Sequence, residues 1–240
     1  MTISQDVLVQ FSPTNAIIGV AGYYVAPEGT QHVIVGFRDG TLTEVYWKTG
    51  QGVHQDTLGN FANGVVGVGG YYNSKDGSQH AIIGTRTAQL IELYWKSGQG
   101  VHQDVLVSSI QIAGVGAYYV SSEDSQHAIY GTSLDELYEV YWKSGQGIHQ
   151  DKLTQFSSDF TFGGVSAYFV PTEGSQHVIV GTNDNNVTEV YWKSGQGVHQ
   201  DVLANFPAGV GAVGGYFVSG ENTQHAICGN HDGTLVELYW

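Results

Sequence analysis

A glutamate, a tryptophan, a lysine, a glutamine and a histidine recur together along this chain, and this set of side chains could bind a polar ligand. In the first copy they are Glu44, Trp47, Lys48, Gln51 and His54. Carboxylate and amide groups form hydrogen bonds with hydroxyl groups, and an indole ring offers a flat apolar surface for the C–H face of a sugar. The combination therefore indicates a carbohydrate site.

The same set returns in the later copies of the motif, and the last copy ends at its tryptophan. The candidate ligand-binding residues are Glu44, Trp47, Lys48, Gln51, His54, Glu92, Trp95, Lys96, Gln99, His102, Glu139, Trp142, Lys143, Gln146, His149, Glu189, Trp192, Lys193, Gln196, His199, Glu237 and Trp240. A structural role is the alternative for two of these residue types. Each Trp could pack between repeats, and each Glu could accept hydrogen bonds from a neighbouring strand.

Two sets of histidines differ in how they recur. Those that follow a glutamine are His32, His80, His127, His177 and His225. They are present in all five copies, which favours satisfied core histidines. Those near the lysine-containing loop are His54, His102, His149 and His199. The last copy lacks this second kind, so the fold does not need it, and a role in binding is the better interpretation.

The repeats themselves predict the fold. The Tyr-Trp pairs recur at intervals of 47–50 residues, and the Gln-His pairs recur at the same intervals. Each repeat has the pattern of four short strands, which in the fourth copy fall at 165–170, 176–181, 187–192 and 198–203. Four-stranded repeats of roughly this length are typical of β-propeller blades. We therefore expect an all-β, five-bladed β-propeller with four antiparallel strands per blade, and we expect residues 1–240 to form one domain.

Two features suggest how the blades are arranged. Residues 2–8 align with residues 197–203, which predicts that an N-terminal strand completes the last blade and covers its open edge. The first strand of each repeat is rich in glycine, as at Gly67, Gly69 and Gly70. Glycine weakens a strand unless close backbone approach requires it. We therefore expect this strand to be the innermost one, beside the central axis.

The segment 187–198, preceded by 177–180, resembles the blade motif of the fucose-binding propeller lectins of the Aleuria lectin type. The count of five blades is also similar to that of tachylectin-type propellers. In the first family an arginine and a glutamate hold sugar hydroxyls, and aromatic rings stack on the sugar. The resemblance implies that the repeated Glu and Trp residues contact a sugar. Here a Gln-His pair stands nearest to the position of that arginine.

Composition limits the partners. The chain has 8 Lys+Arg against 22 Asp+Glu, a net charge of −14, so nucleic acid and anionic membrane surfaces are poor partners. Its single cysteine, Cys228, excludes a disulfide framework. His54 and Asp56 form only an incomplete metal-ligand set, so we expect no metal and no cofactor. The first residues lack the pattern of a signal peptide, which predicts a cytoplasmic or non-classically secreted protein.

Near-identical repeats favour repeated binding over catalysis, because acid–base catalysis needs residues in unlike environments. We therefore expect a non-enzymatic, multivalent lectin or agglutinin that binds glycans or glycoconjugates, as a monomer or a small homo-oligomer. The motif with the loop occurs four times and the strand Glu five times, so either four or five sites are expected, and four is favoured. A protein-interaction scaffold is the main alternative, and repeats amplified without any ligand are another.

Overall fold

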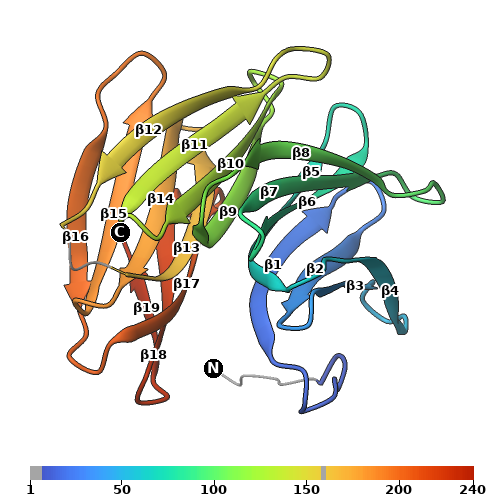
Figure 1. The fold of residues 1–240 in the computed structure, drawn as a ribbon. Helices are drawn as coiled ribbons and strands as arrows, with labels where there is room; N and C mark the ends of the chain where they lie inside the picture. The colour runs from blue at the N-terminus through green and yellow to red at the C-terminus, as the bar shows by residue number, and fades with distance from the viewer. Residues whose placement is uncertain (1–6, 158–160) are drawn as a thin grey trace.

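The computed structural model describes residues 7–157 and 161–240, which form five antiparallel sheets arranged around a common axis (Figure 1). The strands are β1 (Ile17–Val25), β2 (Thr30–Phe37), β3 (Thr41–Trp47), β4 (Val53–Asn60), β5 (Val65–Asn73), β6 (Ser78–Thr85), β7 (Gln89–Trp95), β8 (His102–Ser108), β9 (Ile112–Val120), β10 (Ser125–Thr132), β11 (Glu136–Trp142), β12 (His149–Gln155), β13 (Phe162–Val170), β14 (Ser175–Thr182), β15 (Asn186–Lys193), β16 (His199–Asn205), β17 (Val210–Val218), β18 (Thr223–Asn230) and β19 (Leu235–Tyr239). The predicted all-β fold with five blades is confirmed. None of the described residues forms a helix of the length and hydropathy that a membrane crossing requires.

Each blade is a meander in which consecutive strands pair. The hairpin between its second and third strands turns through a residue with positive φ, which is Gly40, Ala88, Asp135 or Asn185 in the first four blades. At Gly40 a side chain is impossible, because its Cβ would lie 1.8 Å from the carbonyl oxygen of Phe61. The backbone N–H of Phe61 donates to the carbonyl of Gly40 over 2.8 Å, and this hydrogen bond ties the hairpin to the start of the connection that leads to the next blade.

The hydrophobic core lies between neighbouring blades rather than inside any one of them. The cluster between the third and fourth blades joins Tyr118 and Ile129 of one blade to Val178, Val180 and Trp192 of the next. Similar clusters fill the other junctions between consecutive blades. Both faces of the second, third and fourth blades are therefore buried, which explains the long apolar runs of their second strands.

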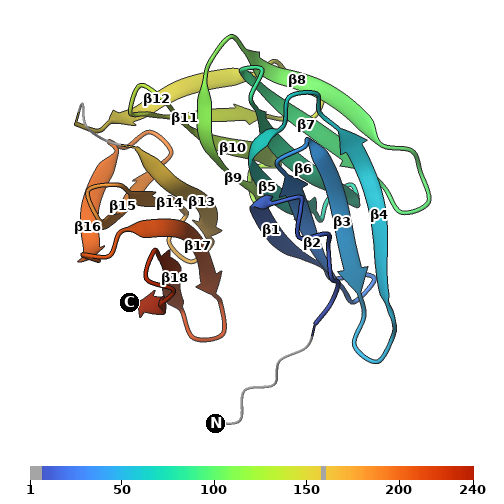
Figure 2. The same cartoon turned by 60° about the horizontal axis from the view of Figure 1, so that its bottom comes forward.

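The innermost strands are β1, β5, β9, β13 and β17, and they surround a narrow central channel (Figure 2). Close approach of their backbones explains their glycines. A Cβ at Gly69 would lie 2.7 Å from the Cβ of Ala117 in the next blade. The prediction that the glycine-rich strand lines the axis is confirmed.

The first and last blades lie at the two ends of the arc of sheets, and their outer faces are exposed (Figure 2). Val20 of β1 is 58% exposed, whereas its counterpart Val68 in the second blade is 5% exposed. Leu235 of the last blade is 73% exposed, whereas its counterpart Leu42 is fully buried. We call the space between these two faces the seam.

Within the described residues the last sheet has three strands, β17, β18 and β19, and the other four sheets have four. The strand predicted to complete it comprises residues 2–8. Residues 1–6, which make up most of that segment, lie outside the described part of the chain. The completion of the last blade by this strand is therefore still a prediction.

Candidate functional site

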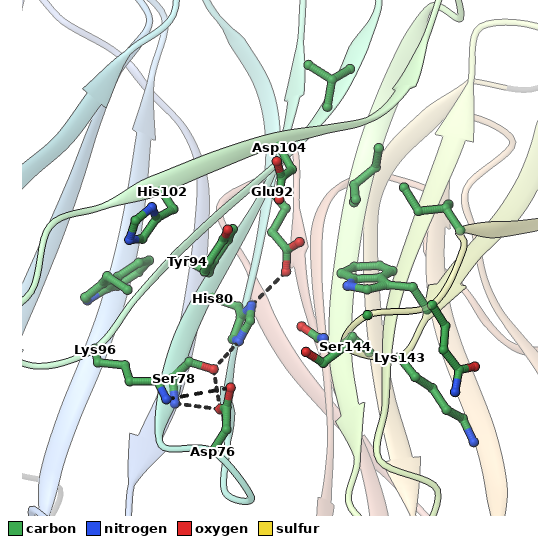
Figure 3. Close-up of a pocket in the computed structure, with 18 of the residues that line it drawn as sticks. Asp76, Ser78, His80, Glu92, Tyr94, Lys96, His102, Asp104, Lys143 and Ser144 are labelled. Atoms are coloured by element: carbon green, nitrogen blue, oxygen red, sulfur yellow. Dashed lines mark hydrogen bonds and ion pairs between the residues drawn. The ribbon is translucent and has the colours of Figure 1, made fainter.

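Three cavities of the same construction lie between consecutive blades, at the first, second and third junctions of the arc. Their volumes are about 430, 520 and 280 Å³. Each is lined on one side by strand residues of the preceding blade and on the other by the tryptophan and the loop of the following blade. The middle cavity, between the second and third blades, shows the arrangement most fully (Figure 3).

The wall from the preceding blade is acidic and aromatic. In the middle cavity it carries Asp76, Glu92 and Asp104, and the last two are direct cross-strand partners. The rings of His80, Tyr94 and His102 stack in a row across the sheet, with centroids 6.1 and 5.2 Å apart. This wall therefore offers hydrogen-bond acceptors beside a series of flat rings (Figure 3).

The opposite wall comes from the following blade and carries no acidic residue. In the middle cavity it consists of Gln126, Trp142 and the loop that bears Lys143 and Gln146. The backbone N–H of Gln146 donates to the carbonyl of Lys143 over 2.9 Å, and Gly145 has a φ of 74°. This tight turn holds the lysine and glutamine beside the indole ring.

A hydrogen-bonded network lies behind the acidic wall. His80 Nδ1 lies 2.7 Å from Glu92 Oε1, and His80 Nε2 lies 2.6 Å from Ser78 Oγ. The hydroxyl of Tyr71 donates to the same oxygen of Glu92 over 3.4 Å. The histidine–glutamate contact recurs in every blade at 2.7–2.9 Å. The Gln-His histidines are thus satisfied strand residues, as their constant recurrence favours.

The glutamine of each Gln-His pair connects this network to the neighbouring blade. With its amide nitrogen toward the second blade, Gln126 donates to the oxygen of Tyr71 over 2.9 Å and to Glu92 Oε1 over 3.2 Å. Its amide oxygen then accepts from Trp142 Nε1 at 3.2 Å. The sequence left packing and ligand binding as alternatives for the repeated glutamate and tryptophan. In the structure both residues contribute to the packing of the blades, and both also line the cavity.

Because this network is buried, we expect the free energy of unfolding to depend on pH in the alkaline range. Desolvation raises the pKa of Tyr71 and Tyr118 well above the usual value for tyrosine, and the adjacent Glu92 and Glu139 add to the shift. In the unfolded chain these tyrosines ionise near pH 10. Their contribution is therefore complete below pH 10 and is lost as the pH rises above it, by roughly 1.4 kcal/mol per pH unit for each residue.

We expect the urea midpoint of unfolding to fall steeply between pH 10 and 11. The double variant Tyr71→Phe/Tyr118→Phe removes both ionisations, so its midpoint should change less over the same interval. A wild-type midpoint that stays constant from pH 9 to 11 would show that these hydroxyls are not buried from water.

The structure brings the predicted residues together across junctions, and the middle cavity also borders Trp95, Lys96 and Gln99 from the same repeat as Glu92. Glu44 faces Trp95, Lys96 and Gln99; Glu92 faces Trp142, Lys143 and Gln146; Glu139 faces Trp192, Lys193 and Gln196. Nine predicted residues line none of these three cavities, and four of them are His54, His149, His199 and Trp240. Trp47, Lys48 and Gln51 belong to the first blade, whose outer face borders the seam, while Glu189 and Glu237 belong to the last two blades.

The predicted histidines near the loop lie on the exposed outer strands. His54, His102, His149 and His199 each stack on a tyrosine of the third strand, with centroids 5.1–5.2 Å apart. His102 lines the middle cavity. Among the described residues no group of three metal-ligating side chains is present.

Sequence reasoning missed two kinds of cavity residue. The first is an acidic residue four positions before each Gln-His histidine, which is Glu28, Asp76 or Glu123 in the three cavities. The second is the tyrosine of the Tyr-Trp pair, such as Tyr94. The acidic residue lies in a connection whose other residues differ between copies. Its constant charge and spacing are the signal that could have identified it.

Comparisons with known proteins establish the fold. The Aleuria aurantia lectin, solved as a mutant in complex with alpha-methyl-L-fucoside, has a TM-score of 0.72 at 15% identity over 96% of this chain. The BP39L lectin of Burkholderia pseudomallei has a TM-score of 0.68 at 12% identity over 92% of this chain. The SapL1 lectin in complex with alpha methyl fucoside has a TM-score of 0.66 at 15% identity over 92% of this chain. The chain spans 76%, 66% and 76% of their respective lengths. No family model matches the sequence, and no curated protein matches it.

Proposed function

We propose that the protein is a multivalent lectin that binds carbohydrate, without converting it, in the pockets between adjacent blades. The observation that carries the proposal is the recurrence of one pocket at three junctions, with the same residue types on the same walls. Two of the lectins with a similar fold were solved with methyl fucosides, which supports a sugar as the ligand.

The chemistry of the pocket fits a neutral sugar. Glu92 and Gln126 provide buried polar groups for hydroxyls, while Trp142 and Tyr94 provide ring surfaces for C–H groups. The acidic wall of the middle pocket carries three carboxylates and the two walls together carry two lysines, Lys96 and Lys143. The excess of negative charge disfavours sialic and uronic acids.

The same geometry argues against hydrolysis. Glycosidases place two carboxyl groups on either side of the bond that breaks. In all three pockets every acidic residue comes from the preceding blade, and the wall with Trp95, Trp142 or Trp192 has none. A bound glycosidic bond would therefore have carboxylates on one side only, which suits binding.

A glycan array on the purified protein, followed by titration calorimetry with the best monosaccharide, tests the proposal. In the triple variant Gln99→Ala/Gln146→Ala/Gln196→Ala, we expect affinity at each pocket to fall about fivefold, as for one lost hydrogen bond of roughly 1 kcal/mol. The matched control removes three exposed glutamines that line none of the three pockets, in Gln55→Ala/Gln103→Ala/Gln150→Ala, and should bind as the wild type does.

Binding to no glycan on the array, together with a captured protein partner, would favour an interaction scaffold instead. Equal losses in the two triple variants would show that the loops are not the site. Linkage of several weak sites in one molecule can raise the apparent affinity for a multivalent glycan by roughly 10²–10⁴. We therefore expect agglutination to need several intact pockets.

A further inference from the structure

One loop of the second blade borders two of the three pockets, which we call the first, middle and third pockets in the order of their junctions. Trp95, Lys96 and Gln99 border both the first and the middle pocket. Among the described residues, none borders both the middle and the third pocket. The first and middle pockets therefore adjoin at this loop, whereas the third pocket is separate.

The end of strand β7 explains how one loop reaches both pockets. Tyr94 and Trp95 are consecutive residues of this strand, so their side chains lie on opposite faces of the second blade. The Tyr94 ring borders the middle pocket, and the Trp95 indole packs in the core between the first and second blades. The loop of residues 96–101 follows directly and lies between the two pockets.

Lys96 connects the walls of the two pockets. It belongs to the loop wall of the first pocket, and its Nζ lies 4.0 Å from Asp76 Oδ2 on the acidic wall of the middle pocket (Figure 3). Its counterparts Lys143 and Lys193 each border one of the three pockets. Of these lysines, only the one on the second blade therefore serves two pockets.

The outer surface of this loop is open. The Gln99 side chain is exposed, and its amide forms no hydrogen bond with another described residue. A Cβ at Gly98 or Gly100 would meet nothing within 4 Å. The Lys96 ammonium carries three N–H donors, and the Gln99 amide both donates and accepts. A ligand that crosses the loop therefore meets hydrogen-bonding groups, and the two glycines leave its path open.

The sizes of the pockets agree with this arrangement. The first and middle pockets have volumes of about 430 and 520 Å³, whereas the separate third pocket has about 280 Å³. The same residue types form the walls of all three. If one sugar residue fills the third pocket, each adjoining pocket has room for such a residue and for part of a further one.

We propose that the first and middle pockets together bind one neutral oligosaccharide that crosses the loop of Lys96 and Gln99. One sugar residue lies in each pocket and at least one more spans the loop, so the ligand has three or more residues. Each of the two pockets carries three carboxylates, which keeps the preference for neutral sugars. This inference rests on the proposed function, because it assigns the length of the ligand that the same sites bind.

Titration calorimetry tests the proposal, first with the monosaccharide that binds best on the glycan array. The same protein is then titrated with linear oligosaccharides of two to six residues built from that sugar. We expect the chain to bind one fewer of the longer oligosaccharides than of the monosaccharide. One site should also be roughly 10²-fold tighter, as for two linked weak sites. The disaccharide is too short to cross the loop and should show no such gain.

Two matched double variants identify the loop. Lys96→Ala/Gln99→Ala should weaken the tight oligosaccharide site roughly 20-fold, as for two lost hydrogen bonds. Lys193→Ala/Gln196→Ala removes the same side chains beside the third pocket and should leave the tight site unchanged. Equal Tm values for the two variants would show that the difference does not come from folding.

Several results would overturn the proposal. Equal stoichiometry and affinity for the monosaccharide and the longer chains would show that each pocket binds alone, and would leave the proposed function intact. Equal weakening of the tight site in the two variants would show that the chain does not cross this loop. Two protein molecules joined by one oligosaccharide in sedimentation velocity would assign the gain to cross-linking. Binding to no glycan would overturn both the proposed function and this inference.

Discussion

Replacing Trp192 with alanine is expected to lower the free energy of unfolding by about 3–5 kcal/mol. The indole is 6% exposed and belongs to the cluster that joins the third and fourth blades, together with Leu137, Ile129 and Phe162. Its removal leaves a cavity between two sheets that are both ordered by their other contacts, so the space cannot collapse fully.

Urea denaturation at neutral pH measures this loss. Trp240→Ala is the control, because Trp240 is 39% exposed and the loss there should be much smaller. If Trp192→Ala kept its stability and lost only glycan binding, the indole would be a ligand platform with no role in packing. If both the stability of the protein and the binding at one pocket fell, the result would support a role for the Trp192 indole in the core and in the pocket.

Replacing Glu139 with alanine should cost about 3 kcal/mol or more, because it leaves polar groups buried without a partner. His127 Nδ1 lies 2.7 Å from Glu139 Oε1, and the hydroxyl of Tyr118 donates to it over 3.0 Å. All three side chains are buried. The double variant Glu139→Leu/His127→Leu removes donor and acceptor together and should recover part of the loss.

The last blade provides the comparison for this variant. Glu237 forms the same contacts with His225 and Tyr216 but is partly exposed at the seam. Because Glu237 is exposed at the seam, we expect Glu237→Ala to cost far less free energy of unfolding than Glu139→Ala. A negligible effect of Glu139→Ala would mean that the network stabilises neither blade.

The periodicity of the sequence was sufficient to predict the number of blades, their strands and the position of the innermost strand. The spacing of the Tyr-Trp and Gln-His pairs identifies five equivalent units, and turn residues divide each unit into strands that the structure contains. The glycines of the first strands, such as Gly69, correctly placed that strand at the axis. These properties depend on local geometry, which repeats faithfully whenever the residues do.

The repeat pattern could not predict which residues of one copy face which residues of the next copy. The sequence groups Glu92 with Trp95 and Lys96, because they are neighbours in the chain. The structure also places Glu92 beside Trp142 and Lys143 of the next blade, because the cavities form between sheets. The acidic residue at Asp76 escaped notice for a related reason. Asp76 is recognisable as a cavity residue only because it lies on the acidic wall beside Glu92. The segment around it has the sequence of an ordinary turn.

The division of each pocket between two blades means that the sequence repeat and the proposed binding site are offset from one another. One repeat supplies the acidic wall of one pocket and the indole wall of the pocket before it. A change made uniformly in one repeat therefore alters two different pockets, each on one side only. Exchange of a whole repeat would therefore create two hybrid pockets, each with one wall from the new repeat and one wall from the original chain.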